Sequence, residues 1–178
     1  MTSPEKSDAD DLITWLRAQL DEDELWAKAA SSPSSSRPSM EPVPGGVHWV
    51  WGLGGNWEHY EPDPLEEYFG ENWDGDERTI TLITREEFDT HSVGPLAHSV
   101  LSYVEEVRTV DAAHIARHDP ARVLAEVDAK RRTLNLHPLR SDGRICNEDE
   151  DIYPCETVRL LALPYADRPG YRQEWRPS

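Results

Sequence analysis

Apolar residues near the start of the chain recur every three to four positions. They fall on one helix face: Leu12, Ile13, Trp15, Leu16 and Leu20. Leu25 and Trp26 are expected to continue this stripe after a run of four acids, Asp21–Glu24. The pattern predicts a helix over residues 7–30 that docks by its apolar face.

Residues 31–46 break this pattern. They are rich in serine, proline and glycine and contain few apolar side chains. Such a segment buries too little apolar surface to offset the entropy lost on ordering it. We therefore predict a flexible linker here, which separates the first helix from an α+β body at residues 47–178.

The period of the pattern changes to two after the linker. Residues 47–51 alternate between two faces, and a glycine-rich turn separates them from a second alternating stretch, residues 57–61. This arrangement predicts a β-hairpin. Residues 79–84 are rich in β-branched side chains and predict a third strand. We expect Trp49 and Trp51 to pack in the core and not to form a ligand-stacking platform.

The stretch that follows the third strand is predicted to be helical. Its apolar positions lie at helical spacing: Leu96, Val100, Leu101, Val104 and Val107. Residues 111–118 are predicted to form a short turn.

A stronger helix start follows this turn. Asp119 suits the N-cap and Pro120 the first helical position, so we predict a helix from Pro120 to Leu136. Residues 137–152 are predicted to be an irregular, acidic loop, and Pro154 to open a last helix. The fold class is therefore α+β, predominantly helical, with a small central antiparallel sheet.

Composition narrows the possible partners. The chain has 178 residues, 35 acidic and 18 basic, and a formal charge of −17. Such a surface repels DNA, RNA and anionic lipid. No apolar run reaches the roughly 18 residues of a membrane span, and the first residues do not resemble a signal peptide. We expect a cytoplasmic protein with an unidentified protein partner, no direct nucleic-acid contact and no membrane contact.

Candidate chemistry is limited to histidine and cysteine. His114 and His118 have the spacing of two ligands on one helix face, but Ile115 stands where a zinc protease needs glutamate. Cys146 and Cys155, with His137 or with that histidine pair, would complete a tetrahedral zinc site.

The alternative is that the two thiols are inert core residues and the two paired histidines lie exposed near helix ends. The sequence contains no matched pair of closely spaced cysteines that would favour zinc. No acid pair, nucleophile or phosphate-binding loop identifies an active site, so we expect neither catalysis nor a cofactor.

Residues 11–24, 114–132 and 153–175 resemble a family of uncharacterised proteins of actinobacteria and their phages, a domain of unknown function. The resemblance implies a Cys-x-x-Cys pair in the loop before Cys155 and a histidine near the C-terminus. In this chain the second cysteine falls on Asp149 and the histidine on Arg168. On that ground we expect no stoichiometric zinc.

These observations predict a non-catalytic, acidic interaction or regulatory accessory protein of actinobacterial or phage origin. The first alternative is a small zinc-binding domain. The second is a nucleic-acid mimic that inhibits a DNA-binding enzyme. Mimicry requires acids that are spaced along a rigid surface, because flexible acids lose entropy on docking.

Overall fold

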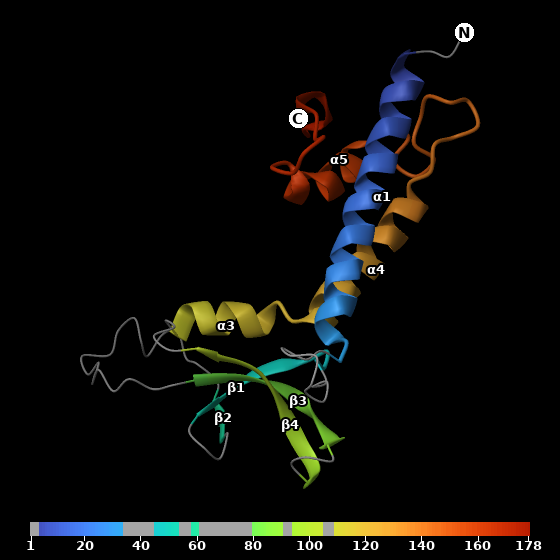
Figure 1. Ribbon diagram of the computed structural model, residues 1–178. Coiled ribbons are helices and arrows are strands. Elements are labelled where there is room, and N and C mark those ends of the chain that lie inside the picture. The colour runs from blue at the N-terminus through green and yellow to red at the C-terminus, as the bar shows by residue number, and fades with distance from the viewer. Residues whose placement is uncertain (1–3, 34–44, 54–57, 61–79, 91–93, 105–108) are drawn as a thin grey trace. The chain divides into compact units, whose positions relative to one another are not determined.

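The computed structural model describes residues 4–33, 45–53, 58–60, 80–90, 94–104 and 109–178 (Figure 1). The chain forms two compact units. Unit 1 combines Met1–Leu25 with Leu124–Ser178, and unit 2 is Trp26–Val123. Unit 1 is therefore assembled from two segments that are separated in sequence by the whole of unit 2.

The described residues form mostly helices, together with one sheet. The helices are α1 (Pro4–Ser31), α3 (Thr109–Arg117), α4 (Pro120–Leu136) and α5 (Glu156–Ala162), with the 3₁₀ turns η1 (Leu163–Tyr165) and η2 (Gln173–Trp175). The predicted α+β class, dominated by helix, is confirmed. Among the described residues, no helix is both long and apolar enough to cross a membrane.

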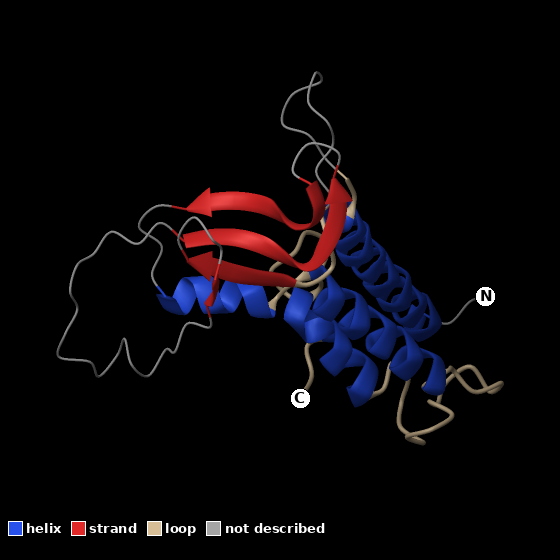
Figure 2. Ribbon diagram, turned by 90° about the horizontal axis from the view of Figure 1, so that it is seen from below, coloured by secondary structure: helices blue, strands red, loops and turns tan. Residues whose placement is uncertain are grey.

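Four antiparallel strands form the sheet of unit 2 in the order β2-β1-β3-β4, drawn red in Figure 2. They are β1 (Trp49–Leu53), β2 (Glu58–Tyr60), β3 (Ile80–Thr90) and β4 (Gly94–Val104). The pairing of β1 with β2 confirms the predicted hairpin. Its turn, at residues 54–57, lies outside the described residues.

β4 corrects the prediction of a helix after the third strand. Residues 94–104 pair with β3 along most of their length, for example Val100 with Ile83 and Ser102 with Leu82. The apolar positions 96, 100 and 104 are four apart. This spacing is close to the helix period of about 3.6 and is also a multiple of the strand period of two, so it fits both structures. The long β3 provides the partner that decides between the two.

Residues 111–118 are also more regular than predicted, because α3 occupies most of them. The backbone N–H of His118 donates to the carbonyl of Ile115 (3.1 Å) and ends the helix. The alanine-rich sequence Ala112-Ala113-His114-Ile115-Ala116 has high helix propensity, which explains the difference.

The predicted start of α4 is confirmed. Asp119 caps the helix, since its Oδ1 accepts the backbone N–H of Arg122 at 2.9 Å. Its other carboxylate oxygen lies 3.4 Å from Nδ1 of His48. Trp51 is 1% exposed, as expected for a core residue, whereas Trp49 is only partly buried. Within the predicted linker, residues 34–44 lie outside the described residues, and the linker stays a prediction.

The core of unit 1 is built from all three of its helices and the C-terminal turns. Its buried side chains are Leu12, Leu16, Leu20, Val127, Leu134, Val158, Ala162, Tyr165 and Trp175. Figure 1 shows α1 running alongside α4 and α5. The predicted leucine stripe is confirmed, but Leu25 and Trp26 do not continue it and are 63% and 67% exposed. Leu25 lies five residues after Leu20, which is about 140° around a helix.

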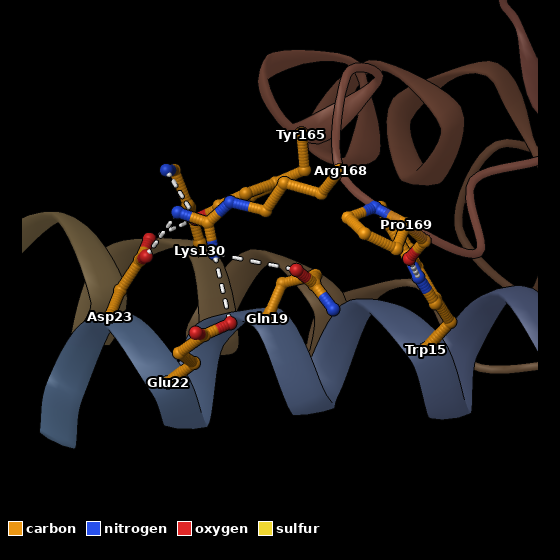
Figure 3. Close-up of polar contacts among 8 residues, drawn as sticks. All are labelled: Trp15, Gln19, Glu22, Asp23, Lys130, Tyr165, Arg168 and Pro169. Carbon is orange, nitrogen blue, oxygen red and sulfur yellow. Dashed lines mark hydrogen bonds and ion pairs between the residues drawn. The ribbon is translucent and has the colours of Figure 1, made fainter.

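Polar contacts fasten α1 to the C-terminal segment of the same unit (Figure 3). The Tyr165 hydroxyl donates to Oδ2 of Asp23 (2.8 Å) and accepts from Nζ of Lys130 (2.9 Å). Arg168 donates to the other oxygen of Asp23 at 2.7 Å. Burial, and then the hydrogen bond to Asp23, raises the pKa of Tyr165, so that the phenol stays protonated and keeps donating.

Candidate metal centre

Four potential metal ligands converge in unit 1. They are His137, Cys146, Asp149 and Cys155, and their ligand atoms all lie within 4.8 Å of one another. Over the part of the chain that the structure describes, this is the only group of three or more such residues found together. All four come from the segment that joins α4 to α5.

The two helices hold the outer ligands of this segment in place. His137 directly follows the last residue of α4, and Cys155 is the N-cap residue of α5. Cys146 pairs with Leu139 in an isolated β-bridge, and Asp149 lies in the turn that follows. The packing of the helices therefore fixes two ligands, and the loop has to deliver the other two.

This loop is not the irregular segment that we predicted, because its backbone is cross-linked by hydrogen bonds. The N–H of Cys146 donates to the carbonyl of Asp151 (2.8 Å), and that of Asn147 donates to the carbonyl of Pro138 (2.9 Å). Glu150 adopts a φ of 55°, in the left-handed region that non-glycine residues avoid. Such strain persists only where the surrounding structure imposes it, and here it lies next to a candidate ligand.

Distances within the cluster fit a small tetrahedral ion. Nδ1 of His137 lies 3.6 Å from Sγ of Cys146, 3.7 Å from Sγ of Cys155 and 3.1 Å from Oδ2 of Asp149. Zinc bonds of about 2.3 Å to sulfur and about 2.0–2.1 Å to nitrogen or oxygen give tetrahedral edges of about 3.6 Å (N to S) and about 3.3 Å (N to O). The three distances from Nδ1 of His137 are close to these edges, and all four donor atoms lie within 4.8 Å of one another.

The same geometry does not fit a catalytic triad. In a cysteine–histidine–carboxylate triad, the thiol and the carboxylate bind opposite nitrogens of the imidazole ring. Here both sulfurs and the carboxylate face Nδ1 of His137. One ring nitrogen carries at most one proton and cannot serve three partners. A cation at the centre of the four donors would serve all of them.

Burial separates the ligands into two kinds. Cys146 and Cys155 are fully buried and His137 is 8% exposed, whereas the side chain of Asp149 is 30% exposed. Burial raises the pKa of the Cys155 thiol, and the hydrogen bond from that thiol is the main cause that lowers the pKa of Asp149. Metal-free, the site therefore favours a neutral thiol beside a carboxylate, and metal binding releases the proton.

The structure brings together three of the five ligands that the sequence suggested. His114 and His118 are both exposed, in α3 and at its end, with ring centroids 4.1 Å apart and the rings tilted by 36°. Nδ1 of His118 is 2.8 Å from the carbonyl oxygen of His114. They are not part of the cluster.

Asp149 was not among the predicted ligands. Its position gave a usable signal, because Cys146-x-x-Asp149 has the spacing of a Cys-x-x-Cys pair and a carboxylate is itself a zinc ligand. The resemblance alone indicates the loss of a ligand at this position, whereas the structure places the carboxylate among the four potential donors.

Comparison with known proteins finds one family. No curated protein and no solved structure matches the chain significantly. A family model matches residues 9–177, a range that includes both α1 and the four donors. The chain therefore belongs to DUF6221, a family of unknown function.

Proposed function

We propose that unit 1 is a zinc-binding domain in which the ion fastens the loop between α4 and α5. The observation that carries this proposal is the convergence of two sulfurs and a carboxylate oxygen on one nitrogen, Nδ1 of His137. Two thiolates and an imidazole are soft to intermediate ligands, which favour zinc over magnesium or calcium.

The proposed role of the ion is structural. Structural zinc sites have four protein ligands, whereas catalytic sites keep a position open for water. Here the chain offers four donors, three of them buried. Because the site exists only when the loop is folded, the binding free energy of the metal adds to the stability of the fold.

Asp149 is the residue that reverses the expectation of no stoichiometric zinc. That expectation rests on Asp149 in the position of a cysteine and on Arg168 in the position of a histidine. The Asp149 carboxylate lies 3.1 Å from Nδ1 of His137, so the cluster has a fourth donor and an imidazole without that cysteine and that histidine. The proposal is therefore a site with two cysteines, one histidine and one aspartate.

The functional class that we propose remains a non-catalytic interaction or accessory protein, and its actinobacterial or phage origin stays a prediction. A metal site with four protein ligands that shapes a loop supports this class. The acidic run in α1 gives little support to mimicry of nucleic acid, because Asp21, Asp23 and Glu24 are paired with arginines of the same unit.

Metal content tests the proposal directly. The full chain is produced in zinc-supplemented medium, purified without chelators and assayed by elemental analysis. We expect about one zinc per chain, and loss of the metal in Cys146→Ser and Cys155→Ser.

The matched control is His114→Ala with His118→Ala, which removes two histidines outside the cluster and should leave the zinc content unchanged. A wild-type chain without zinc after supplementation would overturn the proposal. So would zinc that persists in folded Cys155→Ser.

A further inference from the structure

The four donors of the proposed site differ in burial and in the hardness of the donor atom, and this difference suggests a further binding activity. Cys146, Cys155 and His137 surround the metal position from the protein interior, since each is buried. Asp149 is exposed, and it alone supplies a hard oxygen donor. The solvent-facing position on the metal is therefore occupied by the ligand with the lowest affinity for a soft or borderline ion.

A second observation concerns where the carboxylate can go when it leaves the metal. Oδ2 of Asp149, the oxygen in the cluster, also accepts a hydrogen bond from the Thr157 hydroxyl in the first turns of α5 (3.0 Å). A carboxylate displaced from the ion keeps this partner. Release of Asp149 therefore leaves neither a buried charge nor an unpaired acceptor, the costs that normally hold a ligand in place.

We infer that Asp149 is the exchangeable ligand of the site, and that a small thiol from solution replaces it on the metal. This inference rests on the proposed zinc site and adds a ligand class to it. The step is a ligand exchange: the incoming thiol loses its proton to solvent, its sulfur bonds to the metal, and the metal–oxygen bond to Asp149 breaks. No oxidation takes place.

The charge around the site selects among thiols. Glu148, Glu150 and Asp151 are exposed beside Asp149, and Arg140 lies 3.4 Å from Glu150. A negative local potential lowers the local concentration of anions and raises that of cations. The preferred ligand is therefore a neutral or cationic thiol, not an anionic one.

Cobalt spectroscopy tests the exchange, because the sulfur-to-cobalt charge-transfer band grows with the number of bound thiolates. The full chain is loaded with Co²⁺ under argon and titrated with thiocholine, a cationic thiol that cannot chelate through its nitrogen. We expect the band to rise by about half as a third sulfur joins two, with cobalt retained on dialysis. The anionic thiol 3-mercaptopropionate should need several-fold higher concentrations, and added salt should reduce this difference.

Variants of the acidic run separate the exchangeable ligand from its neighbours. Asp149→Cys fills the position with a resident thiolate, so the band should start at the three-sulfur level and not respond to thiocholine. Asp149→Ala should reach the same level at lower thiocholine concentration than the wild type. Glu148→Gln, which removes a neighbouring charge but no donor, should behave like the wild type with a weaker preference for cations.

The outcomes distinguish the inference from the proposed function. A wild-type chain that binds Co²⁺ without a charge-transfer band overturns both. A two-sulfur band that thiocholine leaves unchanged overturns the inference alone. Loss of cobalt to the thiol also overturns it, because the three buried ligands would then not retain the ion. A response of Asp149→Cys equal to that of the wild type would show that the thiol enters elsewhere.

Discussion

Unit 1 contains two runs of four consecutive acids, Asp21–Glu24 in α1 and Glu148–Asp151 before α5. In the sequence they are equivalent, since each predicts an exposed negative patch. In the structure the first run is largely neutralised. Arg131 pairs with Asp21 and Glu24, and Arg168 pairs with Asp23 and Glu22. The second run delivers Asp149 to a set of buried soft donors.

The difference lies in the backbone that carries each run. A helix turns successive side chains by 100°, so Asp21–Glu24 spreads around α1 and meets arginines from α4 and the C-terminal segment. The second run lies in a tight turn, and the left-handed conformation of Glu150 directly follows Asp149. Two runs of equal charge therefore have different roles: the first stabilises the docking of α1, and the second supplies one donor of a proposed cation site.

Among the changes that test this comparison, removing a buried donor should cause the largest loss of stability. In zinc-containing buffer, Cys155→Ser should lose the stability contributed by the metal. That contribution is about 4 kcal/mol when free zinc exceeds the dissociation constant a thousandfold. For a chain of this size it corresponds to a fall in melting temperature on the order of 10 °C. Differential scanning calorimetry with and without a chelator measures it.

The wild type should show a similar fall when the chelator is added, and Cys155→Ser should show almost none. Equal sensitivity of the two proteins to the chelator would contradict a metal role for the second run.

Removing an ion-paired acid from the first run should cause an intermediate loss of stability. Asp23→Asn removes the charged partner of both Arg168 and the Tyr165 hydroxyl. Hydrogen bonds to charged groups contribute about 1.5–3 kcal/mol, so we expect a loss of that order in urea unfolding.

Glu22→Gln is the matched control for that variant. Glu22 lies 3.5 Å from Arg168 and its side chain is 54% exposed, so the loss should stay below about 0.5 kcal/mol. Equal losses for the two variants would mean that the run acts by charge alone.

Alkaline pH should weaken the docking of α1 through the first run, because it deprotonates the Tyr165 hydroxyl that donates to Asp23. Its pKa is raised in the folded protein by burial and by Asp23, so the folded state holds this proton more tightly than the unfolded state. The resulting stability is fully present below the ordinary tyrosine pKa of about 10 and is lost as pH rises above it. Tyr165→Phe should flatten the fall in unfolding free energy above about pH 10. An unchanged slope would exclude Tyr165 as its source.

The smallest effect on stability and zinc content is expected from a substitution at Glu150, the residue that follows the proposed ligand Asp149. Glu150→Gln breaks a contact with Arg140 at 3.4 Å, and the Glu150 side chain is 78% exposed. Such exposed pairs contribute about 0.2–1 kcal/mol to the free energy of unfolding, so the melting temperature and the zinc content should hardly change. A loss of zinc comparable to that in Cys155→Ser would mean that the whole run, and not one residue of it, binds the ion.

Sequence patterns predicted the elements whose causes are local. Asp119 and Pro120 are a cap and a first-turn residue, and they mark the start of α4 correctly. The leucine stripe of α1 depends only on the helical period, and all three leucines are buried. β4 was missed because positions 96, 100 and 104 satisfy both periods, and only pairing with β3 decides between them.

The candidate site was predicted in part for a similar reason. Cys146, Cys155 and His137 could be named as donors from residue type. Their convergence depends on the loop bonds between Cys146 and Asp151 and between Asn147 and Pro138. Backbone bonds of this kind leave no mark in residue type, so the convergence could not be read from the sequence, although the spacing Cys146-x-x-Asp149 gave a signal for the fourth donor.

The assembly of unit 1 from two distant segments has a consequence during synthesis. The ribosome makes the part of α1 that belongs to unit 1 first, up to Leu25, and then has to add all of Trp26–Val123 before the partners of this part begin to emerge. At about 5–20 residues per second, this interval lasts roughly 5–20 s. Throughout it, Leu12, Leu16 and Leu20 lack the surface that buries them in the finished protein. The nascent chain thus presents an amphipathic helix to chaperones before any donor of the metal centre has been translated.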